Sequence, residues 1–318
     1  MNSCSFPTVR VSASSVTPLA AAHNSPPTTL SASYPVTQGL TFTLHRLRAG
    51  EIGVWQAGQG PAALFIHGWP LNGLQWRDSM RRLGGLRTCV APDLMGLGLS
   101  EVPEETDLSP ISQANMLMEL MESLGHRSFD IVANDSGTAI AQIIMAAAPG
   151  IVRSALLTNG DAHTNSPPAF LAPAIQAARS GEREGLIRAH LADAPFAASD
   201  MGLGTLCYGD PAFLTPTLMR AYFEPLLQSP KRIRQFQAYG VAFEPNPLPP
   251  LRTSLARYSG KVHLLWGDND PFFPLEWAYW LHELFPQSLG VRVVSGGKLF
   301  FPEEHADLVA ALATELWT

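Results

Sequence analysis

The residues best placed for chemistry lie where a short apolar run meets a helix. Residues 129–133 predict a buried strand, and from Thr138 onward small and apolar residues predict a helix. Almost no loop separates the two, so the side chain of Asp135 is held on a sharp strand-to-helix turn, the geometry of a nucleophile elbow. The spacing small-x-nucleophile-x-Gly places Asp135 in the nucleophile position and Ser136 one residue too late. The alternative is that Asp135 merely caps the following helix, a common role for aspartate.

Further polar residues follow other apolar runs. Three segments end such runs: His67-Gly68-Trp69-Pro70, Asn159-Gly160-Asp161-Ala162-His163 and Trp266-Gly267-Asp268-Asn269-Asp270-Pro271. In open α/β sheets, reactive groups collect at the carboxyl ends of the strands. The side chain of His163 could therefore point into the same cleft as Asp135, although a loop histidine more often faces solvent. Taken by themselves, Asp161 beside Gly160 and Asp270 before Pro271 fit ordinary loop and turn residues.

The elements that must position these residues alternate between strands and helices. A hairpin is predicted over residues 40–54, and strands over 62–66, 88–91, 129–133, 154–158, 262–266 and 291–294. Helices are predicted over residues 74–83, 111–124, 138–148, 275–284 and 303–316. This alternation predicts an α/β fold with a doubly wound, mostly parallel sheet.

The same patterns divide the chain into three parts. Residues 38–161 and 261–318 form the predicted core, whereas residues 162–260 are helical and rich in proline, which predicts a helical cap over the strand ends. Residues 1–37 are rich in Ser, Thr, Ala and Pro, and no acidic residue precedes Glu51. That composition predicts a disordered extension, with a targeting peptide as the alternative.

The composition of the 318-residue chain argues against several classes of function. The net charge is −6 and no basic run exceeds residues 231–234, so the electrostatic footprint of nucleic-acid binding is missing. No run of about 18 apolar residues predicts a membrane span. Three cysteines without CxxC spacing, and no HExxH motif, predict neither disulfides nor a metal site. We expect a cytoplasmic protein with a small-molecule substrate and no cofactor, nucleic-acid or membrane partner, in an oligomeric state that the sequence leaves open.

The motifs, in their order, resemble the α/β-hydrolase superfamily, specifically the epoxide hydrolases and haloalkane dehalogenases that use an Asp nucleophile. The likeness rests on His67-Gly68-Trp69-Pro70, on the elbow around Asp135 and on the segment that ends at Asp270-Pro271, and it covers about residues 40–318. The resemblance implies an α/β-hydrolase fold with a helical cap inserted after the sixth family strand. It further implies an epoxide-hydrolase-like enzyme. The aromatic residues of the cap favour a small to medium-sized, mostly apolar substrate over a charged one, although such residues more often pack within the lid. They are Phe170, Phe196, Phe213, Tyr222, Phe223, Phe236 and Phe243.

Residue roles follow from the same resemblance. Asp135 would attack an electrophilic carbon and form an ester, while the backbone N–H groups of Trp69 and Ser136 stabilise the developing negative charge. Asp270 matches the position of the family's acid after the seventh strand. Asp161 matches the alternative acid position of some dehalogenases. A cap tyrosine, with Tyr222 as the first choice, would face the cleft and hold or protonate the leaving oxygen.

Two departures from the family pattern alter these expectations. Many relatives carry Trp directly after the nucleophile, where this chain has Ser136, which makes halide release less favourable. The family histidine follows the last strand as Gly-His-Phe, and an ungapped reading places Leu299 in its position. His305 lies six residues further on and is expected to face solvent. An ester intermediate needs a base to activate water, and histidine is the usual one.

Three functions stay open at this point. The first is an Asp-dependent hydrolase with a displaced base, for which His163 is a candidate. The second is a non-hydrolytic lyase, isomerase or cyclase in which Asp135 is an acid/base or a hydrogen-bonding anchor, because burial beside Leu299 would raise its pKa. The third is a binding protein without turnover. Because fold does not fix the reaction, the sequence alone does not separate hydrolytic from non-hydrolytic chemistry.

We predict that Asp135→Asn abolishes or severely reduces activity while the fold stays intact, because the elbow presents this one side chain over the strand ends. Circular dichroism and a melting curve would verify folding beside the activity assay. Full activity in a folded Asp135→Asn protein, with mass spectrometry excluding deamidation to Asp, would contradict both enzymatic hypotheses.

Overall fold

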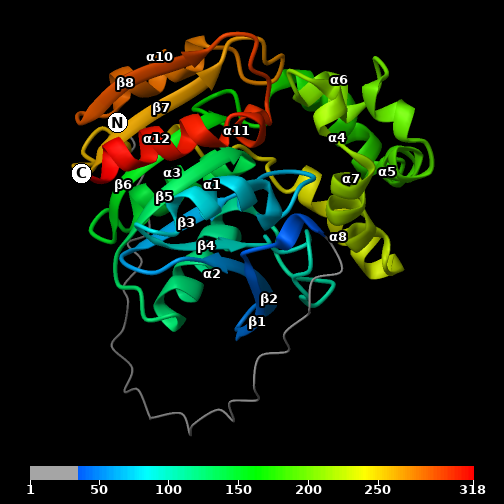
Figure 1. The fold of residues 1–318 in the computed structure, drawn as a ribbon, viewed down its shortest axis with the longest axis horizontal. Helices are drawn as coiled ribbons and strands as arrows, with labels where there is room; N and C mark the ends of the chain where they lie inside the picture. The colour runs from blue at the N-terminus through cyan, green and yellow to red at the C-terminus, as the bar shows by residue number, and fades with distance from the viewer. Residues whose placement is uncertain (1–34) are drawn as a thin grey trace, which may run out of the picture.

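The computed structural model describes residues 35–318, and an eight-stranded sheet forms its centre (Figure 1). The strands are β1 (Thr41–Leu47), β2 (Gly50–Ala57), β3 (Ala62–Ile66), β4 (Thr88–Pro92), β5 (Phe129–Asp135), β6 (Val152–Gly160), β7 (Lys261–Gly267) and β8 (Ser288–Val294). Their order in the sheet is β1-β2-β4-β3-β5-β6-β7-β8. Strands β1 and β2 pair antiparallel, β2 pairs antiparallel with β4, and all other pairs are parallel.

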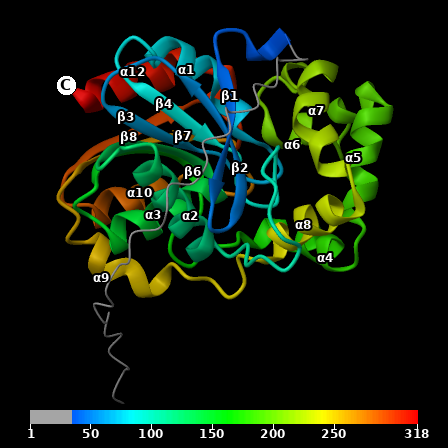
Figure 2. The same cartoon turned by 90° about the horizontal axis from the view of Figure 1, so that it is seen from below.

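Helices cover both faces of this sheet. Those of the core are α1 (Arg77–Leu83), α2 (Pro110–Ser123), α3 (Ser136–Ala147), α9 (Arg252–Leu255), α10 (Glu276–Leu284), α11 (Phe301–Glu304) and α12 (Ala306–Trp317). Figure 2 shows α1 and α12 on one face and α2, α3 and α10 on the other. Every residue of β3 and β5 is buried, which explains their continuous apolar runs, since a parallel strand covered on both faces has no solvent side. The predicted fold class is confirmed.

The segment between β6 and β7 carries the remaining helices. They are α4 (Ala172–Arg179), α5 (Arg183–Ala192), α6 (Leu203–Cys207), α7 (Pro216–Phe223) and α8 (Pro230–Val241). Short 3-10 helices are η1 (Pro35–Thr37), η2 (Gly73–Trp76), η3 (Ala169–Leu171), η4 (Ala194–Ala198), η5 (Pro211–Phe213), η6 (Glu224–Leu227) and η7 (Pro249–Leu251). Helices α4–α8 lie together at one end of the sheet in both ribbon views, as a cap (Figures 1 and 2).

Two predicted boundaries need correction. The cap was expected over residues 162–260, but η7 and α9 pack against α3 of the core, so the cap ends before Pro249. The extension was expected to span residues 1–37, yet Thr37 is buried and the carbonyl oxygens of Val36 and Gln38 accept hydrogen bonds from Arg81 on α1. Composition alone did not locate either boundary, because the last residues of a Pro-rich segment or of a polar tail can still pack against the core. The rest of the predicted extension lies outside the described residues.

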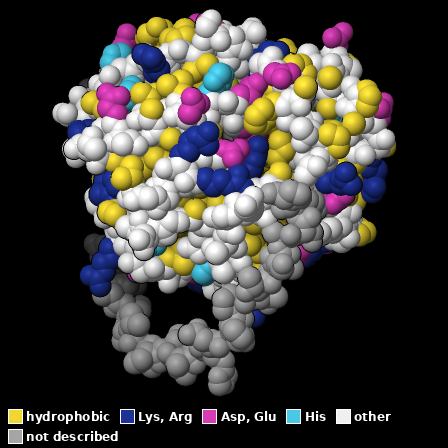
Figure 3. All heavy atoms as spheres, viewed as in Figure 1, with side chains coloured by type: hydrophobic (Ala, Val, Ile, Leu, Met, Phe, Trp, Pro, Cys, Tyr) yellow, Lys and Arg dark blue, Asp and Glu magenta, His cyan; other side chains and the backbone are white. Residues whose placement is uncertain are grey.

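The surface mixes charge and apolar area. On the face that Figure 3 shows, basic and acidic side chains lie among one another and among apolar ones. Within residues 35–318, no helix combines the length and the apolar character that crossing a bilayer requires.

We predict that a chain lacking residues 1–37 melts at a lower temperature than one lacking residues 1–34. The longer deletion removes the buried Thr37 and the Val36 carbonyl that accepts a hydrogen bond from Arg81. Differential scanning calorimetry of the two truncations tests this. Equal melting temperatures would show that residues 35–37 contribute nothing to stability.

Candidate active site

The turn between β5 and α3 has the strained geometry of a nucleophile elbow. Asp135 has φ 55° and ψ −135°, a conformation that side chains other than glycine rarely adopt. Its side chain makes no hydrogen bond of the N-cap type to α3. A Cβ atom on Gly137 would lie 2.5 Å from the Ile66 carbonyl oxygen, so only glycine allows α3 to approach β3 this closely. The backbone therefore presents the Asp135 side chain instead of using it to cap the helix.

The loop after β3 packs directly on this carboxyl. A Cβ atom on Gly68 would lie 2.4 Å from both the Cβ and an oxygen of Asp135, so glycine is required there too. The His67 ring is buried, accepts the Leu94 N–H at Nε2 (3.0 Å) and bonds the Gly68 carbonyl through Nδ1 (2.9 Å). Burial lowers the pKa of His67 to about 4, so this neutral ring shapes the loop and leaves the proton chemistry to other groups. The indole of Trp69 donates to the Phe236 carbonyl of α8 (3.1 Å), which ties the loop to the cap.

A cavity of about 740 Å³ opens beside Asp135, between the strand ends and the cap. We call it the Asp135 cavity. Its walls are mostly apolar, and the core contributes Phe272, Leu299 and Phe300 while the cap contributes Phe243 and Leu203, among others. Of the cap aromatics that the sequence offers, Phe170 and Phe243 line the cavity, whereas Phe236 packs on Trp69. A cavity of this volume and polarity suits a small to medium-sized apolar molecule.

Two buried carboxyl groups lie in this cavity. Asp135 pairs with Gly160 across β5 and β6, and the N–H of Asp161 approaches the Asp135 carbonyl oxygen at 3.4 Å, so the two aspartates lie at adjacent strand ends. Burial raises the pKa of Asp135 well above its usual range, and the neighbouring Asp161 raises it further. The N–H groups of Ser136 and Trp69 oppose this rise by bonding the Asp135 carboxyl.

The pKa of Asp161 is also raised, and it lies near neutral pH. Burial raises its pKa to about 7, and Ser166 and its own backbone oppose the rise only in part. Its Oδ1 atom is buried and has no hydrogen-bond partner within the described residues. A cavity-lining carboxyl whose pKa lies near neutrality, and one of whose oxygens accepts no hydrogen bond, has the properties of a group that transfers protons.

Leu299 and Asp270 differ in how they meet the cavity, although the charge of Asp270 also raises the pKa of Asp135. Leu299 is buried and lines the cavity wall. Asp270 is not among the cavity residues. It accepts hydrogen bonds from Asn159 Nδ2 (2.7 Å) and from the Phe272 N–H (2.8 Å), and burial raises its pKa to about 6. Asp270 is thus held by an amide side chain and a backbone N–H, and no described histidine lines the cavity for it to orient.

The tyrosine that faces the cavity is Tyr239 and not Tyr222. The Tyr239 hydroxyl lies 2.9 Å from the Ser136 Oγ, and both residues line the cavity. Tyr222 instead donates to Glu303 Oε2 (2.5 Å) and accepts from Arg77, away from the cavity. The expectation for Tyr222 is therefore wrong. Both tyrosines lie on predicted cap helices, and the sequence carries no signal for which helix turns its hydroxyl inward.

A buried polar cluster ties the cap to the core at this point. Glu303 of α11 accepts from Tyr208 of the cap (2.6 Å) as well as from Tyr222, and it forms an ion pair with Arg77. We call these four residues the Glu303 cluster. It fixes the segment that follows Leu299, because Glu303 lies four residues further along the chain.

Among the other candidates, His163 does not reach the cavity. Its ring packs on Trp280 with centroids 4.5 Å apart, so it is not placed to replace the family histidine. His305 is exposed, as expected. The sequence interpretation missed Arg183 and Cys207, which both line the cavity from the cap. Nothing in the pattern of residues sets Arg183 apart from Arg179 or Arg188, which pair with Glu244 and Glu184.

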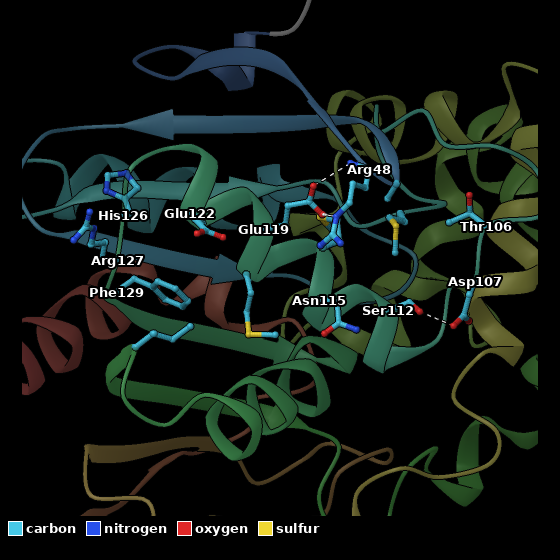
Figure 4. A pocket seen from close by; sticks show the side chains of 15 residues that line it. Arg48, Thr106, Asp107, Ser112, Asn115, Glu119, Glu122, His126, Arg127 and Phe129 are labelled. Atoms are coloured by element: carbon cyan, nitrogen blue, oxygen red, sulfur yellow. Dashed lines mark hydrogen bonds and ion pairs between the residues drawn. The ribbon is translucent and has the colours of Figure 1, made fainter. Parts of the chain in front are cut away.

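A second depression lies elsewhere on the surface, with a volume of about 900 Å³ (Figure 4). It reaches Phe129 at the amino end of β5, the opposite end of the strand from Asp135, and shares no residue with the Asp135 cavity. Its charged walls are partly satisfied internally, since Arg48 pairs with Glu119 at 2.9 Å and Ser112 donates to Asp107 at 2.5 Å. The Asp135 cavity is therefore the better candidate for the active site.

Comparisons with known proteins agree with this fold. Residues 61–305 match the family model described as alpha/beta hydrolase fold. The chain is 29% identical to epoxide hydrolase 3 of Mus musculus over 133 residues, which is 42% of this chain and 35% of that protein. It is 34% identical to a haloalkane dehalogenase of Mesorhizobium japonicum over 90 residues, 28% of this chain and 29% of that one. The solved structure of the epoxide hydrolase CorEH superposes with a TM-score of 0.72 at 19% identity, covering 87% of this chain and 98% of that one.

The extent of these matches limits what they transfer. This chain aligns with only about a third of the length of the curated relatives named above. The match to the solved structure covers nearly all of that chain but establishes the fold alone, because the identity is low.

The raised pKa of Asp161 predicts a specific pH dependence of stability. Its folded pKa of about 7 lies above the usual value of 3.8, so the folded state holds a proton that the unfolded state has lost between these pH values. The free energy of unfolding should therefore fall as pH rises from about 4 to about 7. Asp161→Asn should flatten this dependence, in part because Asp135 loses its charged neighbour. Urea denaturation across this range tests the prediction, and Asp200→Asn, at an exposed residue of the same cavity, is the control. An unchanged slope in Asp161→Asn would contradict it.

Proposed function

The chain belongs to the alpha/beta hydrolase fold family of enzymes, and from this premise we propose that it hydrolyses a small to medium-sized, mostly apolar electrophile through Asp135, in the manner of an epoxide hydrolase, with Asp161 in place of the family histidine. One observation carries the proposal. Asp161 lies beside Asp135 in the same cavity, with a pKa of about 7 and a buried oxygen that has no partner. A general base works best when its pKa lies near the working pH, whether it is an imidazole or a carboxylate.

The resting pair would hold one proton between the two carboxyls, since two adjacent buried carboxylates repel each other. The reactive form has Asp135 ionised and Asp161 protonated. In the first half-reaction the Asp135 carboxylate attacks an epoxide carbon, the carbon–oxygen bond breaks, and the oxygen takes the proton from Asp161. The products of this step are an ester on Asp135 and an ionised Asp161.

In the second half-reaction Asp161 is the base. It takes a proton from water, and the hydroxide adds to the ester carbonyl to give a tetrahedral oxyanion held by the N–H groups of Trp69 and Ser136. When this oxyanion collapses, the bond from the Asp135 carboxyl carbon to the diol oxygen breaks, and that oxygen takes the proton left on the Asp135 carboxyl. Asp135 is then ionised and Asp161 protonated, so the pair again holds one proton. One carboxyl thus acts as acid and then as base, the alternation that retaining glycosidases use.

The Tyr239 hydroxyl has a different role in this scheme. Burial raises its pKa above the usual value, which opposes loss of its proton. Asp161 is therefore the better donor, and Tyr239 contributes a hydrogen bond to the substrate oxygen or to Ser136. Ser136 and Leu299 both argue against the dehalogenase branch. Ser136 provides no indole N–H for a halide, and Leu299 provides no histidine.

A second candidate is a non-hydrolytic lyase, isomerase or cyclase reaction in which Asp135 exchanges protons and forms no ester. The strongly raised pKa of Asp135 favours it, because a protonated carboxyl is a donor and not a nucleophile. The backbone strain at Asp135 and the two N–H groups aimed at its carboxyl favour the nucleophile.

We predict that turnover of an aliphatic epoxide in H₂¹⁸O labels the Asp135 carboxyl, because water attacks the ester carbonyl. Peptide mass spectrometry measures the label. Product formation without label in Asp135 would exclude the ester route and leave the non-hydrolytic or direct-water alternatives.

We further predict that Asp161→Asn lowers epoxide turnover about 10²–10⁴-fold, the usual contribution of a general acid/base. An alkyl bromide needs no proton donor, so this variant should still form the ester with it and then accumulate an adduct on Asp135. Asp200→Asn is the matched control and should behave as the parent protein. Unimpaired epoxide turnover by Asp161→Asn would remove Asp161 from the mechanism.

A further inference from the structure

The Asp135 cavity contains a cation that has no anionic partner. Arg183 begins α5, and its guanidinium lies over the Trp69 ring at 4.8 Å from the ring centroid. Its Nε atom is buried and unbonded, and no carboxylate within residues 35–318 forms an ion pair with it. Among the described residues that line the cavity, Arg183 supplies the sole positive charge.

The other acids of the cavity do not serve as its partner. The pKa of Asp135 is governed by burial, by the charges of Asp161 and Asp270 and by backbone N–H groups, and that of Asp161 by burial and neutral hydrogen-bonding groups. Glu182 and Asp200 are exposed at the margin of the cavity and form no ion pair with Arg183. Burial lowers the pKa of Arg183 only to about 10, so the side chain stays charged at neutral pH. A charged group facing an apolar cavity is costly unless something pairs with it.

We propose that the substrate supplies this partner, as a carboxylate bound by Arg183 at the cap side of the cavity. The reacting end of that substrate lies at Asp135, and this part of the inference rests on the proposed function. A carboxylate matches the planar fork of a guanidinium and forms two parallel hydrogen bonds with it. A phosphate dianion fits less well, because one arginine does not balance its charge beside two further acids.

The position of Arg183 also restricts the substrate's length. Trp69 contributes both the backbone N–H that bonds the Asp135 carboxyl and the indole that lies under Arg183. The anion site and the reacting carboxyl are thus separated by a single residue. The electrophilic carbon and the carboxylate are therefore separated by about the length of the Trp69 side chain, and the apolar chain that joins them runs along walls such as Leu186 and Phe243. The substrate class is a medium-chain acid with an epoxide several carbons from its carboxylate.

Equilibrium binding tests the anion site without any turnover. Octanoate, octanol and octyl phosphate are titrated into the full-length protein by isothermal calorimetry. Octanoate should bind at least tenfold more tightly than either other ligand. Arg183→Met, which keeps the length of the side chain, should lose about tenfold or more of the octanoate affinity and little of the octanol affinity. Arg183→Lys should recover part of the loss, because it keeps the charge but not the fork.

Arg188→Met is the matched control, since Arg188 lies on the same helix and is exposed and paired with Glu184. It should leave octanoate binding unchanged. Equal affinity of the parent protein for octanoate and octanol, or equal losses in the two Met variants, would overturn the proposal. Tighter binding of octyl phosphate would assign the site to a phosphate instead, and would overturn it as well. If Arg183→Met fails to fold, the comparison of ligands and the Arg183→Lys variant still decide.

The kinetic arm separates this inference from the proposed function. The ratio of kcat/KM for 7,8-epoxyoctanoate to that for 1,2-epoxyoctane, which has the same terminal epoxide but no carboxylate, should exceed 10 and should fall to about 1 in Arg183→Met. Octanoate binding that depends on Arg183 without turnover of either epoxide would support the anion site and contradict the hydrolase. Turnover of both epoxides with no dependence on Arg183 would support the hydrolase and contradict the anion site.

Discussion

The burial of a carboxyl without a cation beside it is the constraint on which this site depends. The strained backbone of Asp135 directs its side chain into the cavity. Gly68 and Gly137 lack the Cβ atoms that would collide with Asp135 and with the end of β3. Leu299 lines the cavity wall, and no described histidine does, so backbone N–H groups oppose the rise in the pKa of Asp135 while Asp161 adds to it. The proposed sharing of one proton between the two aspartates and the pH dependence of stability both follow from that balance.

Much of the fold was predictable because its signals are local. The buried strands are continuous apolar runs, and the elbow is set by small residues at fixed spacing around Asp135, so both could be recognised without long-range information. Leu299 was expected beside Asp135 for another reason, since the resemblance put it in the position of the family histidine, and it does line the cavity. The predicted cap was too long at its end because α9 is a helix like its neighbours, and only its contact with α3 assigns it to the core.

The polar groups of the cap were not predictable in this way. Tyr222 and Tyr239 lie on similar helices, and the difference between them depends on which side chain meets Glu303 across more than 60 residues of chain. Arg183 looked like any other arginine of the cap, because its lack of a partner is a property of the folded state. Asp161 could be located as a strand-end residue, whereas its raised pKa depends on a burial that spacing does not reveal.

The Glu303 cluster has a consequence for how substrates enter. It fastens α6 and α7 to the core through buried hydrogen bonds and an ion pair, and α8 is fastened through Trp69 and through Arg232 on Glu101. Within residues 35–318, no hydrogen bond joins α4 or α5 to the core, and the exposed side chains of Phe170 and Met201 line the cavity on that side. Polar contacts thus join the cap to the core along α6–α8, whereas α5 meets the core through the stacking of Arg183 on Trp69. Under the proposed anion site, a bound carboxylate adds a polar link between α5 and the reacting end of the cavity, so that the substrate itself completes the attachment of the cap on that side.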